Sequence, residues 1–435
     1  MKDEHRTTNS QMNLAKSFSI YTIASFFNKG MMALLAFFLS NYILPRENGV
    51  LSLYSVFVLF VLPFIILGMP SSLILEHTKL DKKEYKLYFN SSLVLSSFSF
   101  IILLLIFLVA GNFVSGIVTV PYRLLLFGMF YAYFMLYQEN ILAYLRVLKR
   151  PWHFLAISAT KDILEIALVI FLVIQSGRGA EGRVLAGVLS GGLIFIFGLI
   201  FFYKEGLIHF RVSKKYLREE FRFGISQVFF QFNVFILTAT DKYLINWFNP
   251  HDKTDLGVYF MANQFAFIIN VLVSAFFFSY QPELYKYLTD FTEVNKLKVL
   301  RIKYLFAGFL LICTLLLCIA IPTVYHLFIN KKYHPGIPYV AWLAFGYFFW
   351  GLYALMLGFL YYYKKNRVVI IFSVLSAIVC IVLNYFFIRA YGVMGAAYAN
   401  FFIYALLFIC LFITVNRVCN LHLPWLRFRA IFKRT

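Results

Sequence analysis

Long apolar runs recur from one end of this chain to the other. Each is about 20 residues or more, which is the length an α-helix needs to cross a hydrocarbon layer about 30 Å thick. The twelve runs, with bounds that each shift by a few residues, span 14–43, 48–75, 87–110, 121–145, 153–175, 184–203, 223–248, 257–282, 304–328, 337–363, 368–389 and 393–416. The pattern predicts an all-α integral membrane protein with about twelve transmembrane helices.

The composition supports this prediction. Hydrophobic residues make up 62% of the 435 residues, charged residues only 14%, and the mean hydropathy is +0.78. About a quarter of the residues in ordinary soluble domains are charged. The first run is too long for the apolar core of a signal peptide and has no small-residue cleavage site, so we interpret it as the first transmembrane helix.

The formal net charge of +21 invites a nucleic-acid interpretation, but the positions of the 40 Lys and Arg residues argue against one. They concentrate in the N-terminus, the even-numbered connections and the C-terminus. The odd-numbered connections hold eight: Arg46, Arg123, Arg178, Arg183, Lys253, Lys331, Lys332 and Arg389. Because cytoplasmic loops of membrane proteins are enriched in Lys and Arg, we expect both termini in the cytoplasm and no nucleic-acid partner.

Cysteine and histidine give no sign of a metal site or a cofactor. The five cysteines show no C-x-x-C spacing, and the eight histidines form no H-E-x-x-H pattern. We interpret the cysteines as small apolar residues and predict no metal ligand and no cofactor.

A basic stretch near the middle, 203–224, divides the twelve runs into two groups of six. "LPRENGVLSLY" (44–54) and "NPHDKTDLGVYF" (249–260) both read Pro, polar spacer, Gly-Val and then a Tyr-bearing helix. These stretches suggest a parallel repeat, although many hairpins use Pro and Gly. The predicted parts are a cytoplasmic N-terminus (1–13), an N-terminal bundle (14–203), a basic connector (204–222), a C-terminal bundle (223–416) and a basic cytoplasmic tail (417–435).

Polar residues follow one face of the seventh run. Gln227, Gln231, Thr238 and Asp241 lie within about 80° of one another on a helix, with Lys242 adjacent but turned away. Charged groups inside a membrane are costly and usually functional, so we predict that this stripe faces a cavity or another helix. The alternative is that Asp241 and Lys242 lie at the outer headgroup level.

Other runs carry similar polar faces, and together they predict a water-accessible cavity between the two bundles. The residues assigned to a substrate cavity are Tyr21, Asn28, Lys29, Lys161, Gln227, Gln231, Asn263 and Asn270. The acids assigned to ion coupling are Glu139, Asp162, Glu165 and Asp241. Two alternatives stay open: Lys161 and Glu165 form a neutralised pair that only joins helices, and the Asn and Gln residues serve as interhelical glue.

Several motifs resemble those of the Wzx-type polysaccharide biosynthesis flippases. They are "LPRENGVLSLYSVF", "LGMPSSLIL", "YLREEFRFGISQ", "TATDKYLI", "DLGVYFMANQF" and "LNYFFIRAYGVMGAAYANFF". Their order spans nearly the whole chain. The sequence departs from the family at Asp241-Lys242, where Asp-Arg is usual, and at Glu76-His77, where many relatives carry an Arg.

The resemblance implies membership of the multidrug/oligosaccharidyl-lipid/polysaccharide (MOP) exporter superfamily. That membership implies a MATE-like fold of two pseudo-symmetric six-helix bundles around a central cavity, in the bacterial inner membrane. The implied activity is alternating-access transport of an undecaprenyl-pyrophosphate-linked oligosaccharide, such as an O-antigen unit, to the periplasmic leaflet. Cavity lysines would neutralise the diphosphate, acids would couple transport to H⁺ or Na⁺, and membrane lipids and polysaccharide polymerase machinery would be partners.

Three rival interpretations remain. An ion-coupled multidrug exporter of the same superfamily would favour acids and aromatic residues over lysines in its cavity. A membrane polymerase or glycosyltransferase, which would be an enzyme, would carry a large outer loop, and no odd-numbered connection exceeds about a dozen residues. A channel or scaffold fits less well because the polar stripes are asymmetric within one chain.

Overall fold

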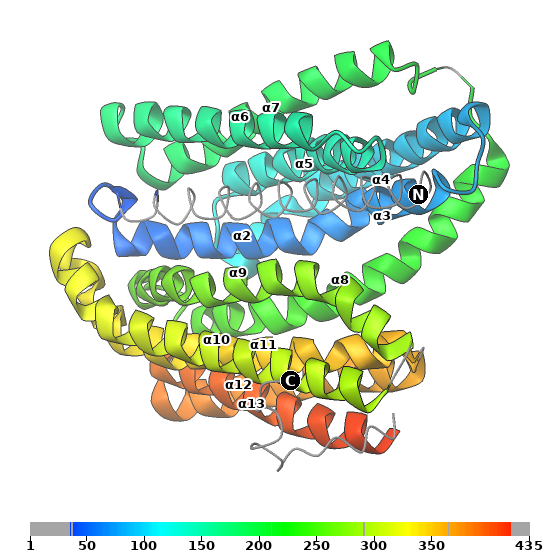
Figure 1. Cartoon of the computed structure of the whole chain (residues 1–435). Helices are drawn as coiled ribbons and strands as arrows, with labels where there is room; N and C mark the ends of the chain where they lie inside the picture. Colours follow the sequence, from blue (N-terminus) through cyan, green and yellow to red (C-terminus); the bar gives the residue numbers. More distant parts are fainter. Residues whose placement is uncertain (1–34, 36–37, 210, 290–291, 364, 419–435) are drawn as a thin grey trace. The chain divides into compact units, whose positions relative to one another are not determined.

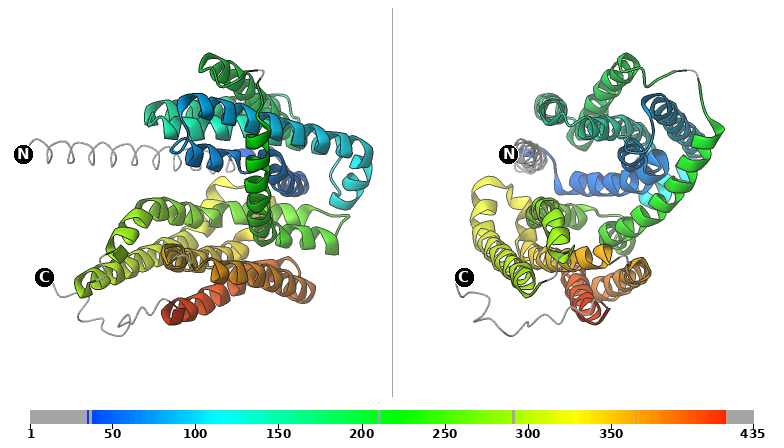
Figure 2. Two further views of the ribbon diagram at one scale, coloured as in Figure 1. Left: turned by 90° about the vertical axis from the view of Figure 1, so that its right-hand side faces the viewer. Right: turned by 45° about the vertical axis from the view of Figure 1, so that its right-hand side comes forward.

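The computed structural model describes residues 35, 38–209, 211–289, 292–363 and 365–418 (Figure 1). In these ranges all the regular elements are helices, as the further views in Figure 2 also show. They are α2 (Pro45–Ile66), α3 (Met69–Glu76), α4 (Lys82–Val118), α5 (Tyr122–Val147), α6 (Pro151–Val169), the π-helix η1 (Ile170–Gln175), α7 (Gly179–Lys204), α8 (Lys214–Phe248), α9 (Thr254–Thr289), α10 (Glu293–Phe328), the 3₁₀-helix η2 (Lys331–Gly336), α11 (Ile337–Tyr362), α12 (Asn366–Tyr391) and α13 (Val393–Val418).

The eleven predicted spans from 48–75 onward all correspond to helices, with α2 and α3 together forming one and α6 and η1 another. The first predicted span, 14–43, lies almost entirely outside the described residues. Within the described ranges, nine helical stretches are long and apolar enough to cross a membrane. The stretches α5 and α6 are not among them, and the 19 residues of α6 include Lys161, Asp162 and Glu165.

The described chain divides into two compact units. The first contains residues 35, 41–243 and 250–257, and the second contains 38–40, 244–249 and 258–418. In the first unit, α5 packs against both α2 and α7. Glycines on α7 allow this approach: a Cβ on Gly191 would lie 3.2 Å from Phe134, and one on Gly198 would lie 3.0 Å from Ile141. Small residues serve the same purpose wherever membrane helices pack closely.

A break separates α2 from α3, and α8 packs against it. Leu67 and Gly68 both have positive φ, 50° and 70°, which ends α2 four residues after Pro63. A Cβ on Gly68 would lie 2.6 Å from Cγ of Gln227, and one on Gly224 would lie 2.7 Å from the Leu67 carbonyl oxygen. Glycine is therefore required on both sides of this crossing.

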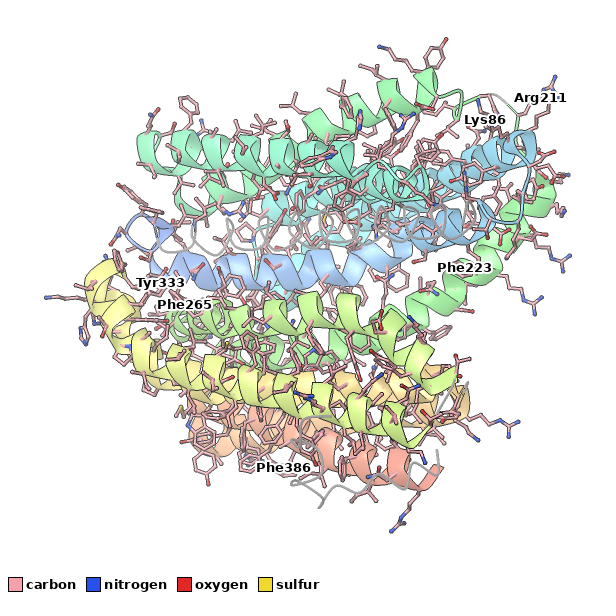
Figure 3. The ribbon with its side chains drawn as sticks, in the orientation of Figure 1. Lys86, Arg211, Phe223, Phe265, Tyr333 and Phe386 are labelled. Carbon is pink, nitrogen blue, oxygen red and sulfur yellow. The ribbon has the colours of Figure 1, made fainter. Side chains whose placement is uncertain are left out.

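The connection between α7 and α8 is held against the first turns of α4. The Lys86 ammonium donates to the Glu205 carbonyl at 2.8 Å, and the Asn90 amide donates to the Arg211 carbonyl at 2.9 Å. The Asn90 side-chain oxygen also accepts from the His209 backbone amide at 3.2 Å. Figure 3 shows Lys86 and Arg211 at the same end of this unit. Side chains of α4 thus bind three backbone polar groups of the connection.

In the second unit, α13 packs against α11 and α12. Ala396, Ala397 and Ala399 are fully buried, as expected where helices approach closely. Gly392 has φ +59° between α12 and α13, and a Cβ on Gly395 would lie 1.9 Å from the Phe387 carbonyl oxygen. The Gly and Ala residues of the "RAYGVMGAAYA" motif therefore have a packing role.

The glycines of the two Gly-Val stretches, Gly49 and Gly257, both lie in the first unit, where the two stretches meet. A Cβ on Gly49 would lie 2.2 Å from the Lys253 carbonyl oxygen, and one on Gly257 would lie 1.7 Å from the Pro45 carbonyl oxygen. The Asn48 amide donates to the Gly257 carbonyl at 3.2 Å. The shared motif is thus explained by a backbone-to-backbone contact that only glycine allows.

Candidate functional site

A cluster of four charged residues joins α6 to α7 in the first unit. The Lys161 ammonium lies 2.6 Å from Oε2 of Glu165 and 3.4 Å from Oδ1 of Asp162. Arg183, from the second turn of α7, donates to Oε1 of Glu165 at 2.6 Å. We call Lys161, Asp162, Glu165 and Arg183 the α6–α7 charge cluster.

The burial of this cluster determines what its members can do. The Glu165 side chain is 2% exposed, those of Lys161 and Asp162 are 9% and 8% exposed, and that of Arg183 is 27% exposed. Charges removed from water are tolerated when they are paired and hydrogen-bonded, and each carboxylate oxygen of Glu165 faces a cation. Arg183 is the one member of the cluster that is accessible enough to exchange partners.

Glu139, on α5, is half-buried and has no ion pair within 4.0 Å in the described part of the chain. The cations that act on it electrostatically are Arg146 and Lys161. It therefore belongs to the surroundings of the charge cluster without joining its contacts.

Asp241 and Lys242 form an ion pair at the end of α8, with the Lys242 ammonium 3.1 Å from Oδ1 of Asp241. Lys242 also donates to the Thr238 carbonyl at 2.5 Å, and the two charged residues are 6% and 8% exposed. The expectation that Lys242 turns away from Asp241 is wrong. Its long, flexible side chain folds back along the helix, which neutralises a buried carboxylate.

The remaining predicted site residues are placed as follows. Gln227 and Gln231 are half-buried on α8, and Gln227 packs against Gly68 in the first unit. Asn263 and Asn270 are half-buried on α9 in the second unit, where the Tyr347 hydroxyl donates to the Asn263 side-chain oxygen at 2.9 Å. Tyr21, Asn28 and Lys29 lie outside the described residues. The cavity between the bundles stays a prediction.

A pocket of about 400 Å³ lies in the first unit beside α3, α4 and the first turns of α8. We call it the α3–α8 pocket; it is lined by Ser72, Leu75, Glu76, Lys79, Tyr88, Glu219, Arg222, Phe223 and Ser226. Lys79 and Glu76 pair at 2.6 Å. Behind the pocket wall, the fully buried Glu220 accepts hydrogen bonds from Ser72 at 3.0 Å and from Tyr88.

Three charged residues that the structure places in helices were not singled out from the sequence. Arg183 precedes the predicted start of its helix by one residue, and Glu220 falls in the predicted connector, yet both lie inside helices. Lys303 was placed in a connection but lies in α10, 4% exposed, with its ammonium 3.5 Å from the centre of the Phe359 ring. Burial of a charge near a helix end depends on its tertiary neighbours, so hydropathy gives no signal for it.

Comparison with known proteins agrees with this fold. A family model described as "Polysaccharide biosynthesis protein" matches residues 14–287, and no curated protein matches the chain. An inward-facing multidrug resistance MATE family transporter of the MOP superfamily has a similar structure, with a TM-score of 0.70 and 13% identity over 93% of this chain and 96% of that chain. For the Vibrio cholerae MATE transporter VcmN, the TM-score is 0.60, with 12% identity over 95% of this chain and 98% of that chain.

The lipid II flippase MurJ, in an inward closed conformation, is also similar in structure. Its TM-score is 0.65, with 17% identity over 91% of this chain and 87% of that chain. At these low identities, the structural similarity shows a shared fold. The family model covers more than half of the sequence and so shows the family. The chain therefore belongs to the polysaccharide biosynthesis protein family and has the MATE-like fold of the MOP superfamily.

Proposed function

We propose that this protein is a flippase, and not an enzyme, that carries an undecaprenyl-pyrophosphate-linked oligosaccharide across the bacterial cytoplasmic membrane by alternating access. The observation that carries the proposal is the combination of a polysaccharide biosynthesis family with a fold also found in a lipid II flippase. The oligosaccharide would then enter surface polysaccharide such as O-antigen, with polymerase machinery as a partner.

The α6–α7 charge cluster contains a cation that could bind a diphosphate. A diphosphate cannot enter an apolar environment without cations to neutralise it. Arg183 is part-exposed and holds Glu165, and a guanidinium binds phosphate oxygens in the same forked geometry that it uses for carboxylates. If Arg183 turns to a substrate, Lys161 still neutralises Glu165 at 2.6 Å. The structure thus supports Arg183 as a substrate contact and Lys161 as the residue that keeps Glu165 neutralised.

The other residues keep the roles expected from the sequence as parts of this proposal. Tyr21, Asn28 and Lys29 would contact the head group together with the amide side chains Gln227, Gln231, Asn263 and Asn270. Glu139, Asp162, Glu165 and Asp241 would carry H⁺ or Na⁺. The paired state of Asp241 and Glu165 means that a coupling ion would have to compete with Lys242 or with Lys161 and Arg183.

The test is a strain that lacks the gene, in which lipid-linked oligosaccharide in membrane extracts and polysaccharide at the cell surface are both quantified. Complete lipid-linked units should accumulate while surface polymer is lost. Re-expressed wild-type protein should restore the polymer, Arg183→Gln should not, and Arg123→Gln should. Arg123 is a matched control because it pairs with Glu181 at 3.2 Å through side chains that are 69% and 40% exposed.

Two results would contradict the proposal. Normal surface polymer in the deletion strain, with heightened sensitivity to cationic compounds, would favour a multidrug exporter. Full restoration by Arg183→Gln at wild-type protein levels would remove Arg183 from the substrate path.

A further inference from the structure

Glu220 is an acid buried among neutral partners. It is fully buried, and no cation lies within 4.0 Å of its carboxylate in the described part of the chain. Its contacts are the hydroxyls of Ser72 on α3 and Tyr88 on α4, and the Ser92 hydroxyl lies beside the same carboxyl. A buried carboxylate without a cation is costly, and a protonated carboxyl is much less so.

The neighbouring hydroxyls can provide hydrogen-bond partners for both oxygens of the protonated Glu220 carboxyl. The Ser72 oxygen lies 2.9 Å from the Met69 carbonyl oxygen and 3.0 Å from Oε1 of Glu220, but a serine has one hydroxyl proton. If Ser72 donates to Met69, a proton on Oε1 of Glu220 can be donated to the Ser72 oxygen, while Tyr88 donates to Oε2. Both carboxyl oxygens of Glu220 and the hydroxyls of Ser72 and Tyr88 then have a hydrogen-bond partner.

The Ser72 and Tyr88 hydroxyls can also stabilise the ionised form of Glu220. Each can rotate to donate to a carboxylate oxygen, which stabilises the negative charge. Both protonation states are therefore accommodated by hydroxyl rotation, without movement of the backbone.

A route for the proton is present. Ser72 and Tyr88 both contact Glu220 and line the α3–α8 pocket, so two groups of the hydrogen-bonded chain reach its surface. The charged groups around this pocket are Glu76 of α3, Lys79 in the following turn, and Glu219 and Arg222 of α8. Glu76, the one acid of α3, is paired with Lys79 at 2.6 Å.

Glu220 also lies on the face of α8 that crosses the α2–α3 break. Glu220, Gly224 and Gln227 are spaced at four and three residues, which places them on one side of the helix. They contact Ser72, Leu67 and Gly68 in turn. We call this contact the α3–α8 seam. Opening of the seam would expose Glu220 to water, where ionisation is favourable.

We propose that Glu220 is a proton-binding site of this protein, loaded through the α3–α8 pocket, and that its protonation closes the α3–α8 seam. If opening the seam promotes loss of the proton, binding of the proton must promote closure, because linkage between two equilibria is reciprocal. The role of this step in coupling rests on the proposed flippase function, since a seam that opens and closes is a moving part of alternating access.

The experiment uses the full-length protein in native membranes and dicyclohexylcarbodiimide, a reagent that modifies protonated carboxyls in apolar surroundings. Peptide mass spectrometry reads the adduct on Glu220 and on its neighbour Glu219, which is exposed and lines the pocket. The Glu220 adduct should fall by roughly tenfold per pH unit above its midpoint. Tyr88→Phe should preserve the adduct to higher pH, because the carboxylate loses a donor.

A pH-independent adduct, or labelling of Glu219 alone, would overturn the proposal. Protection by Na⁺ at constant pH would replace the proton site by a sodium site and would also overturn it. These results do not depend on the transported substrate, so they are distinguishable from a failure of the flippase proposal in the deletion strain.

The coupling role has its own test in that strain. Glu220→Gln reproduces the hydrogen bonds of the protonated acid and should fold to normal levels, yet lose most of the surface polysaccharide because it cannot release a proton. Glu219→Gln is the matched control and should retain it. Wild-type polysaccharide with Glu220→Gln at normal protein levels would show that the site does not couple to transport.

Discussion

Some buried charges in this protein have partners both on their own helix and on a neighbouring one. Glu165 receives Lys161 from its own helix but Arg183 from α7. We expect Glu165→Gln to lower the free energy of unfolding by about 3–5 kcal/mol, because it leaves two cations without their shared carboxylate. The measurement is thermal stability of the detergent-solubilised protein.

The control for this prediction is Glu181→Gln, which removes the acid from an ion pair that is exposed on both sides. Such pairs contribute about 0–1 kcal/mol, so its melting temperature should stay close to that of the wild type. Equal losses for the two variants would mean that the α6–α7 charge cluster adds no stability.

Residue-scale predictions from the sequence succeeded where the partner lies one helical turn away. The i, i+4 spacing of Lys161 and Glu165 anticipated their ion pair. The contact of Arg183 with Glu165 and the hydroxyl cage of Glu220 could not be predicted, because both join residues from different helices. The orientation of Lys242 was wrong because helix geometry places the Cβ of a lysine, not the end of its flexible side chain.

At the scale of elements, close backbone contacts depend on particular glycines. A Cβ on Gly257 would lie 1.7 Å from the Pro45 carbonyl oxygen, which is rigid backbone. We therefore expect Gly257→Ala to reduce stability and expression markedly. Gly308, in α10, has no neighbour within 4 Å of the same position, so Gly308→Ala should be neutral or slightly stabilising. Fluorescence-detected gel filtration of tagged variants compares the two, and equal yields would contradict the expected clash.

The attachment of the connector to α4 gives another prediction at this scale. Asn90 bonds the backbone at two positions within the connector, His209 and Arg211. Asn90→Ala removes both contacts and should speed trypsin cleavage after Arg211, which is exposed. Ser97→Ala, which alters a hydroxyl contact with Tyr133 farther along α4, is the control. Cleavage at the same rate in both variants would mean that Asn90 does not restrain the connector.

Hydropathy predicted the elements well because transmembrane helices satisfy their backbone groups internally and expose apolar side chains to lipid. It could not locate the break at Leu67 and Gly68, since positive φ at a leucine has no signature in composition. It also placed the start of the seventh helix at 223, whereas α8 begins at Lys214. The basic, water-exposed first turns of α8 read as a loop, although they carry the Glu220 contacts.

At the scale of the whole molecule, the distribution of Lys and Arg predicts which helix ends face the cytoplasm. In a variant without native cysteines, Lys82→Cys, at the first residue of α4, should be protected from a membrane-impermeant maleimide in intact spheroplasts. Asp252→Cys, between α8 and α9, should be labelled, and both residues are exposed. Permeabilised cells supply the control, since both cysteines should then react.

The α3–α8 pocket lies at the same end of the first unit as Lys82, so this orientation would load Glu220 with protons from the cytoplasm. The opposite labelling pattern would reverse the topology and require protons to enter the pocket from the periplasm.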